Sequence, residues 1–201
     1  MMLERIRISI ARASEIRNLE RQVAASPRAK ACNIHQLGHD RAVWRIPVPG
    51  QADRYMSASA GHIGSEMFAV HVDVNAFYLA WLRSDEQCVL RSQMPRDYKY
   101  AYAVDGFAQG SSNPVPLADV GAWNDERGRT HIGFTNGITR SFWLISNGAP
   151  SFPVQVYGRE SAELLHRTAG TNQGPICYAD LFAHAEPRNA PNRSPSRAPR
   201  P

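Results

Sequence analysis

The residues best suited to chemistry stand in the short segment T-N-G-I-T-R-S at positions 135–141. This polar turn separates two apolar runs, so we expect a strand to end at Asn136 and a helix to begin after Gly137. The first amides of a helix have no partner within it, and the helix dipole favours anions there. The sequence therefore predicts a phosphate or nucleotide site made of Asn136, Gly137, Thr139, Arg140 and Ser141.

Each polar side chain of this turn has a role in that prediction. Arg140 would supply a permanent, forked positive charge, and Thr139 and Ser141 would act as hydroxyl donors. A purely structural role fits the same residues. In it, Asn136 caps the helix, Gly137 makes the tight turn, and Arg140 reaches solvent or a carboxylate. The residues alone leave both alternatives open.

Two further groups could contact nucleic acid. The segment RDYKYAY at 96–102 places Arg96 and Lys99 among tyrosines, and aromatic rings beside cations suit a single strand. An amphipathic helix or strand edge is the more ordinary role for such a segment. His131, just before the polar turn, could serve as a base or as a contact to phosphate, or could equally face solvent. We treat Arg96, Lys99 and His131 as candidate DNA contacts.

Catalytic and metal-binding groups are harder to locate. The acidic residues near Arg140 in sequence also fit turns and caps: Asp105, Asp119, Asp125 and Glu126. Cys32, His35 and His39 have the spacing C-x₂-H-x₃-H, yet Gly38 interrupts any helix and no second ligand cluster follows, so no metal site is predicted. No H-E-x-x-H, Walker P-loop or G-x-S-x-G motif occurs, which gives protease, P-loop ATPase and esterase functions no support.

The elements that would position these residues follow from the apolar spacing. The alternating run at 67–73 predicts a strand, and Asp73 can cap the helix after it, whose apolar stripe predicts a core face. The stripe consists of Val74, Phe77, Tyr78, Trp81 and Leu82.

Around the polar turn we expect a strand-turn-helix-strand unit of βαβ type, with a nearly all-round apolar helix ended by Gly148 and the strand FPVQVYG after it. Residues 124–130 predict a turn and residues 88–92 a short strand. Residues 31–65 are typical of irregular or strand-like structure.

Charge and composition set the domain organisation. The 201 residues fit one domain, and the net charge of +5 divides into +4 over residues 1–30, −2 over 31–183 and +3 over 184–201. The first segment is expected to be a basic arm, an edge strand or a docking helix. The Pro- and Arg-rich tail is expected to be disordered. Both basic ends suit nucleic acid or acidic partners. No run of 18 apolar residues exists, and the three cysteines indicate no disulfide framework, so a cytoplasmic protein is expected.

At the polar turn the chain resembles a known superfamily. The stretch FTNGITRSFWLISNGAPSFPVQV is similar to the F-[ST]-D-G-R-H-R-x-x-x-L-x-x-x-G-x-x-x-[FIL]-P-V core of the ParB/sulfiredoxin-like fold. Within it, the chain resembles plasmid fertility inhibition factors of the Osa and FiwA group, which share an F-x-x-x-W helix, an R-Y-like segment and a P-V strand. Here these are Phe77 to Trp81, RDYKY at 96–100 and PVPL at 114–117. The resemblance covers about residues 67–158 and implies a single α/β (α+β) domain over residues 31–183.

The resemblance implies a function and a set of partners. Such a protein suppresses conjugative transfer of another plasmid by acting on the coupling ATPase of the type IV secretion system, or on the transferred DNA, at the inner face of the inner membrane. ATP or another nucleotide would be the cofactor of the site. A nucleotide-dependent DNA-cleaving enzyme and a non-catalytic ParB-like DNA-binding module are the alternatives. Ile138 stands where sulfiredoxins place their reactive cysteine, so sulfiredoxin activity is not expected.

Overall fold

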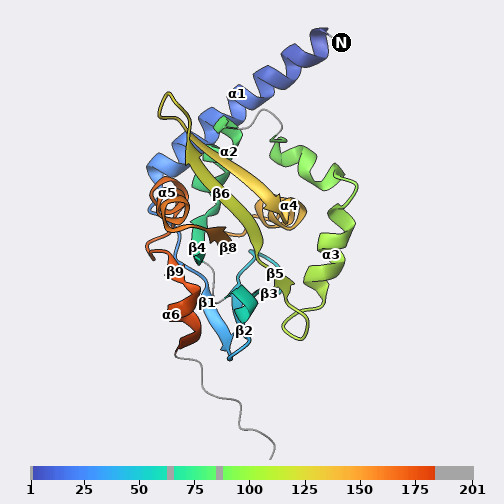
Figure 1. Ribbon diagram of the computed structural model, residues 1–201. Coiled ribbons are helices and arrows are strands. Elements are labelled where there is room, and N and C mark those ends of the chain that lie inside the picture. The colour runs from blue at the N-terminus through green and yellow to red at the C-terminus, as the bar shows by residue number, and fades with distance from the viewer. Residues whose placement is uncertain (1, 63–65, 85–87, 184–201) are drawn as a thin grey trace, which may run out of the picture.

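The computed structural model describes residues 2–62, 66–84 and 88–183, and the predicted tail at 184–201 lies outside them. Two sheets form the framework (Figure 1). The four-stranded sheet has the order β1-β2-β3-β5, with β1 (Asn33–Leu37), β2 (Arg41–Ile46), β3 (Arg54–Ser59) and β5 (Val115–Pro116). The five-stranded sheet has the order β7-β6-β8-β4-β9, with β4 (Met67–Asp73), β6 (Ala118–Asn124), β7 (Thr130–Asn136), β8 (Ser151–Tyr157) and β9 (Ile176–Cys177).

Helices cover these sheets. They are α1 (Met2–Ala25), α2 (Val74–Ser84), α3 (Tyr100–Ala108), α4 (Ile138–Ser146), α5 (Arg159–Ala169) and α6 (Tyr178–Ala183), with the 3₁₀ helices η1 (Ala60–His62) and η2 (Arg91–Arg96). The predicted mixed α/β class is confirmed, and its ParB/sulfiredoxin-like subclass stays a prediction. No helix within the described part of the chain is long and apolar enough to cross a membrane.

The β4–α2 unit matches the sequence prediction closely. Six of the seven residues of β4 are buried, and the whole predicted stripe of α2 is buried. Asp73 caps α2, because its Oδ1 accepts a hydrogen bond of 2.9 Å from the amide of Ala76. Its Oδ2 also accepts one of 2.9 Å from the amide of Ala29, which ties the segment after α1 to the same strand end.

The unit around the polar turn differs from the predicted βαβ arrangement. Strands β7 and β8 are not neighbours, because both flank β6. β7 pairs antiparallel with β6, whereas β8 pairs parallel with it, so β7 and β8 run in opposite directions. The βαβ prediction is therefore wrong. The order of strands in a sheet depends on pairing with β6, which the local pattern of residues 131–158 does not contain.

Aromatic contacts fix the position of α4, which is wedged into the core as its apolar sequence predicts. The ring of Phe142 stacks on Trp81 of α2 with centroids 5.6 Å apart. Trp143 meets Phe107 of α3 at 4.7 Å. These pairs hold α4 against α2 and α3, and Figure 1 shows α4 beside α3.

Residues 31–65 are more regular than expected, and residues 88–92 differ from their predicted structure. Residues 33–59 contain three antiparallel strands that form a meander. The prediction of a short strand at 88–92 is wrong. Residues 91 and 92 already belong to the 3₁₀ helix η2, which contains Pro95. Proline cannot donate a ladder hydrogen bond, which disfavours a paired strand at this place.

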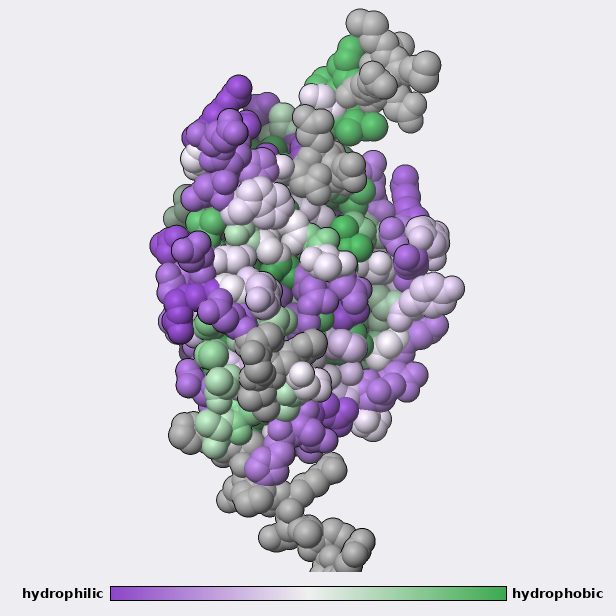
Figure 2. Space-filling model, in the orientation of Figure 1, coloured by the Kyte–Doolittle hydropathy of each residue, from purple (hydrophilic) through white to green (hydrophobic). Residues whose placement is uncertain are grey.

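Residues 2–25 form the helix α1, which is the docking-helix alternative that the sequence left open beside a basic arm and an edge strand. Leu19 is buried against the core, and the Arg12 guanidinium donates to the carbonyl of Leu82 in the last turn of α2 and to that of Cys88 beyond it. The N-terminal part of α1 projects past the rest of the molecule (Figure 1). Its isoleucines Ile6 and Ile10 are exposed, and Figure 2 shows hydrophobic side chains at that end.

A candidate ligand pocket at the start of helix α4

A pocket of about 540 Å³ lies where the end of β7 passes into α4. The segment from η2 to α3 forms its other wall, and Val115 of β5 closes one side. Of the residues that the sequence proposed for binding, Asn136, Gly137, Thr139, Arg140 and Lys99 line this pocket. Its further lining residues are Asp97, Tyr98, Tyr102, Ala103, Val115, Thr135 and Ile138. The structure thus gathers most of the predicted phosphate site and one predicted DNA contact in one place.

Gly137 makes the turn into α4. Its φ of 83° lies in the left-handed region, and a Cβ at this position would stand 2.8 Å from both Cα and Cβ of Ala118. Glycine is thus required by conformation and by space. Gly137 also takes the N-cap position that the sequence offered to Asn136, which is instead the last residue of β7. Within the described residues, no side-chain hydrogen bond caps this helix start, so no capping side chain competes for its first amides.

The guanidinium of Arg140 is partly used by the fold. Its Nη1 donates to the carbonyl oxygens of Pro116 and Leu117, at 2.6 and 2.9 Å. Burial lowers the pKa of Arg140, and the nearby carboxylate of Asp119 opposes this shift. The group stays charged because the ordinary arginine pKa is so high. Arg140 therefore joins the start of α4 to the β5–β6 connection while it lines the pocket.

Ser141 does not belong to the pocket. Its side chain is fully buried, and its hydroxyl donates to the carbonyl of Gly137 at 3.3 Å. A serine in the first turns of a helix commonly bonds back to the preceding turn in this way. The predicted role of Ser141 as a phosphate donor is corrected accordingly, and Thr139 remains the hydroxyl that lines the pocket.

The turn before α3 presents exposed aromatic rings. Tyr98 is 81% exposed and Tyr102 is 74% exposed, and both line the pocket. The ammonium of Lys99 lies 5.2 Å from the centroid of the Tyr98 ring, and the hydrogen bond with Tyr98 raises the pKa of Lys99. Arg96 is also exposed but does not line the pocket. The sequence indicates the tyrosines and the cations of this segment together; that Tyr98 and Tyr102 line the same pocket as α4 depends on the tertiary arrangement.

His131 lies at the opposite end of β7, away from the other candidates. Its Nδ1 is 3.1 Å from the carbonyl of Ser84, and its Nε2 is 3.2 Å from Oδ2 of Asp125. Its ring also stacks on Trp123 with centroids 5.7 Å apart. The predicted DNA contacts are therefore separated: Lys99 lines the pocket, Arg96 ends η2 outside it, and His131 lies at the far end of β7.

The acidic candidates are not gathered around Arg140. Asp125 accepts the amides of Arg127 and Arg129 in the β6–β7 turn, and Glu126 is exposed in the same turn. Asp105 is exposed on α3. Only Asp119 approaches Arg140, and it accepts a hydrogen bond from Gln155. No carboxylate pair suited to acid–base work is thus formed among these residues.

The cysteine–histidine spacing does not form a common site either. Cys32 is buried and its Sγ contacts Ser151, and this burial raises its pKa to about 11. His35 lies on the exposed strand β1 and packs on Tyr55. Within the described residues, no group of three His, Cys, Asp or Glu side chains could hold a metal ion.

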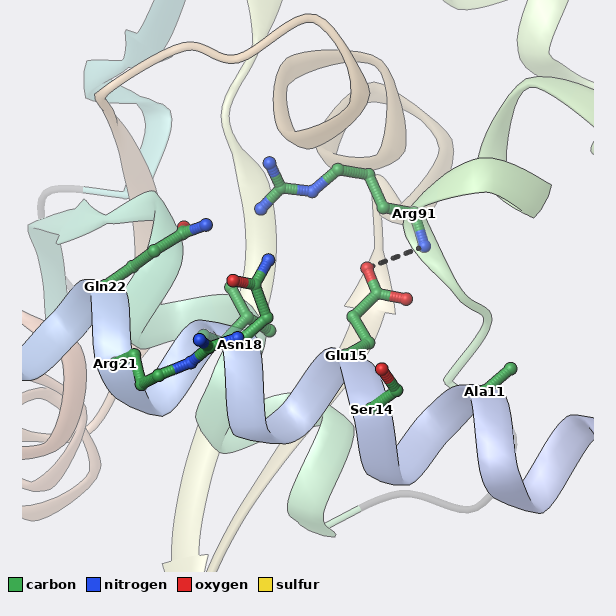
Figure 3. A pocket seen from close by; sticks show the side chains of 8 residues that line it. Ala11, Ser14, Glu15, Asn18, Arg21, Gln22 and Arg91 are labelled. Atoms are coloured by element: carbon green, nitrogen blue, oxygen red, sulfur yellow. Dashed lines mark hydrogen bonds between the residues drawn. The ribbon is translucent and has the colours of Figure 1, made fainter.

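A second cavity, of about 480 Å³, lies between α1 and η2 (Figure 3). Glu15 on α1 accepts a hydrogen bond of 3.3 Å from the amide of Arg91, which the dashed line in Figure 3 marks. The Arg91 guanidinium donates to Asn75 and lies over the Tyr78 ring. These contacts connect α1 to the body of the fold, and we assign them a docking role.

Comparison with known proteins identifies the family. A model described as "Plasmid Fertility inhibition factor" matches residues 69–170, which is half of the chain. The chain belongs to the plasmid fertility inhibition factor family. It is 36% identical over 173 residues to the protein osa of Shigella flexneri, covering 83% of this chain and 89% of the relative.

A solved member of the family has the same fold. The crystal structure of an oncogenic suppression activity protein, described as a plasmid fertility inhibition factor in a gold(I) cyanide derivative, matches with a TM-score of 0.78 and 34% identity. It covers 89% of this chain and 96% of the solved one. The family match begins inside β4 and ends at Gly170, so it includes every residue of the α4 pocket and none of α1 to β3.

Proposed function

We propose that this fertility inhibition factor suppresses conjugative transfer of another plasmid by acting on the type IV secretion coupling ATPase or on the DNA delivered to it. The observation that carries this proposal is the α4 pocket, which lies wholly inside the region shared with the family. The pocket combines Lys99 and Arg140 with the uncapped start of α4, so it offers positive charge and amide donors to a phosphate-bearing ligand.

A phosphate group of ATP, of another nucleotide or of DNA would meet Thr139, Lys99 and the first amides of α4. Arg140 contributes charge from the pocket wall, although its Nη1 is held by two backbone carbonyls. This placement supports a binding role more directly than a cleaving one, because the acidic candidates lie on separate elements: α3, β6 and the β6–β7 turn. We keep a nucleotide-dependent DNA-cleaving activity, and the ParB/sulfiredoxin-like ancestry of the pocket, as secondary proposals.

A mating assay tests the proposed function. The gene is placed in a donor that carries a conjugative plasmid, and transfer frequency is measured for the wild type, for Lys99→Gln combined with Thr139→Ala, and for Arg129→Ala as a control. Arg129 is an exposed arginine outside the pocket. We expect the wild type and the control to reduce transfer, and the pocket variant to restore it. Unchanged transfer in the presence of the wild type contradicts the proposed function.

A pull-down separates the two targets. Retention of the coupling ATPase by the wild type and equally by the pocket variant would place the ATPase contact on another surface. Loss of retention in the pocket variant alone would place it at the pocket. If neither form retains the ATPase while transfer is still suppressed, the DNA is the target.

A further inference from the structure

We propose that the groove between β6 and α5 holds the chain's own basic, proline-rich tail, residues 184–201. In this arrangement a proline of the tail packs on Trp123, and arginines beside it pair with Glu160 and Glu163. The groove has a volume of about 520 Å³ and shares no residue with the α4 pocket, so the inference does not depend on the proposed function. The docked tail would keep its arginines from other acidic partners.

The groove is built into the fold. Trp123 of β6 lies in one wall, and Glu160 and Glu163 of α5 lie in the other. The amide of Ala122 donates a hydrogen bond of 2.9 Å to the hydroxyl of Ser161, which fixes α5 against β6. The two walls therefore keep their spacing without a ligand.

Trp123 gives the groove an exposed aromatic ring. Its side chain is 51% exposed, although it stacks on His131 with ring planes 15° apart. It also lies close over Gly133, where a Cβ would come within 2.9 Å of the indole. These contacts hold the indole in place and leave about half of it uncovered. Proline-rich segments dock on aromatic surfaces of this kind.

The groove is acidic. Glu160 and Glu163 are exposed lining residues, against one lining guanidinium, that of Arg167. The α4 pocket and the α1–η2 cavity instead hold more cationic than acidic side chains. Glu163 has Arg159 and Arg167 at 4.0 and 3.9 Å, and exposed pairs of this kind exchange partners at little cost. The groove therefore favours a cationic ligand.

The tail has the complementary chemistry. Residues 184–201 contain five prolines, four arginines and one glutamate. Arg193 and Arg197 stand on either side of Pro195. Proline-rich segments favour the extended polyproline helix, so they lose little conformational entropy when they dock. Such a segment can offer a pyrrolidine ring to Trp123 and one guanidinium to each glutamate of the groove.

The tail is also long enough to reach the groove. It follows α6, which ends at Ala183, and both α5 and α6 contact β4. In Figure 1, α6 lies below α5 on the same side of the view. At the polyproline rise of about 3.1 Å per residue the tail would span about 55 Å, whereas a fold of this size has a radius of gyration of about 16 Å. Because the tail is tethered, even a weak site would be occupied.

Acrylamide quenching of tryptophan fluorescence tests the inference on the full-length protein. Trp123 dominates the quenching, because the other three tryptophans are at most 4% exposed. Arg193→Glu combined with Arg197→Glu should raise the quenching constant about twofold, since the docked tail covers Trp123 in the wild type. Salt at about 0.5 M should raise it similarly in the wild type by screening the ion pairs. Trp123→Phe should remove the difference.

Variants of the groove provide the matched comparison. Glu160→Gln combined with Glu163→Gln should raise the quenching constant as the tail variant does. Glu126→Gln is the control, because Glu126 is an exposed acid of the β6–β7 turn outside the groove. Glu160→Arg, added to the tail variant, should restore part of the protection of Trp123 by reversing the charges of both partners. Circular dichroism checks that the variants keep the fold.

Three outcomes would overturn the inference. One is equal quenching of the wild type and the tail variant. Another is an effect of Glu126→Gln as large as that of the groove variant. The third is protection that disappears when the wild type is diluted about a hundredfold, because docking within one chain does not depend on protein concentration. That result would assign the groove to the tail of a second copy. Mating suppression is not a readout, so failure of the proposed function leaves this test unaffected.

Discussion

The two ends of strand β7 carry similar polar side chains and use them differently. At its beginning, His131 has both ring nitrogens engaged, by the carbonyl of Ser84 and by Asp125, and one face of its ring covered by Trp123. At its end, the chain enters α4 without a side-chain cap and opens into a pocket lined by exposed tyrosines. Because polar groups with full partners stabilise a fold and those left open can bind, the difference separates a structural end from a binding end.

Glycines turn the chain on either side of this strand, and they provide the sharpest test. Gly137→Ala should destabilise the protein by about 3 kcal/mol, from the left-handed backbone and the contact with Ala118 together. Gly128→Ala, at φ 74° with nothing within 4 Å of its Cβ, should cost about 1 kcal/mol. Urea unfolding of both variants measures the difference. Equal costs would show that packing against Ala118 does not matter.

The arginines near the two ends give the next largest effect. Arg140→Ala should lower the free energy of unfolding by about 2 kcal/mol, because two carbonyls lose a charged donor. Arg129→Ala should cost less than about 1 kcal/mol, since its pair with Asp125 is exposed. Denaturant midpoints compare the variants, and Arg140→Lys tests whether one charged donor is enough. If Arg140→Ala lowered the free energy of unfolding by less than Arg129→Ala, the Arg140 hydrogen bonds would not be the stronger contribution.

Asp125, in the β6–β7 turn, makes the stability of the protein depend on pH. Hydrogen bonds from the backbone N–H of Arg129 first, and then from His131, lower the pKa of Asp125 below its ordinary value. A depressed carboxyl pKa contributes stability above the ordinary value near 3.8, and this contribution is lost as the pH falls below it. Melting temperatures of the wild type should fall more steeply below pH 4 than those of Asp125→Asn. Parallel curves would contradict this contribution.

The smallest effect is expected for His131 itself. Because its ring nitrogens already have partners, His131→Asn should leave mating suppression within about twofold of the wild type. Its melting temperature should fall by a few degrees through the loss of the Asp125 and Ser84 contacts. Loss of mating suppression in this variant would mean that both ends of β7 take part in the function.

Local patterns predicted the elements and the pocket's principal residues. The stripe of α2, the cap at Asp73 and the glycine turn into α4 depend on residues three or four positions apart, so their spacing indicates them directly. Residues far apart in sequence were predicted less well. The antiparallel relation of β7 and β8 depends on β6, and the docking of α1 depends on single contacts such as Leu19 in a helix with mixed Ile and Arg spacing.

By itself, the sequence determined that a glycine must open α4 and that a positive, hydroxyl-bearing turn follows, because these are consequences of backbone conformation and residue type. It also determined the family, through the spacing of that turn and the strand after it. Only the tertiary structure decided which side chains face the pocket. In the folded protein the Ser141 hydroxyl bonds to the Gly137 carbonyl, and His131 lies at the far end of β7, outside the pocket. Tyr98 and Tyr102 line the pocket together with the start of α4, because α3 packs against α4.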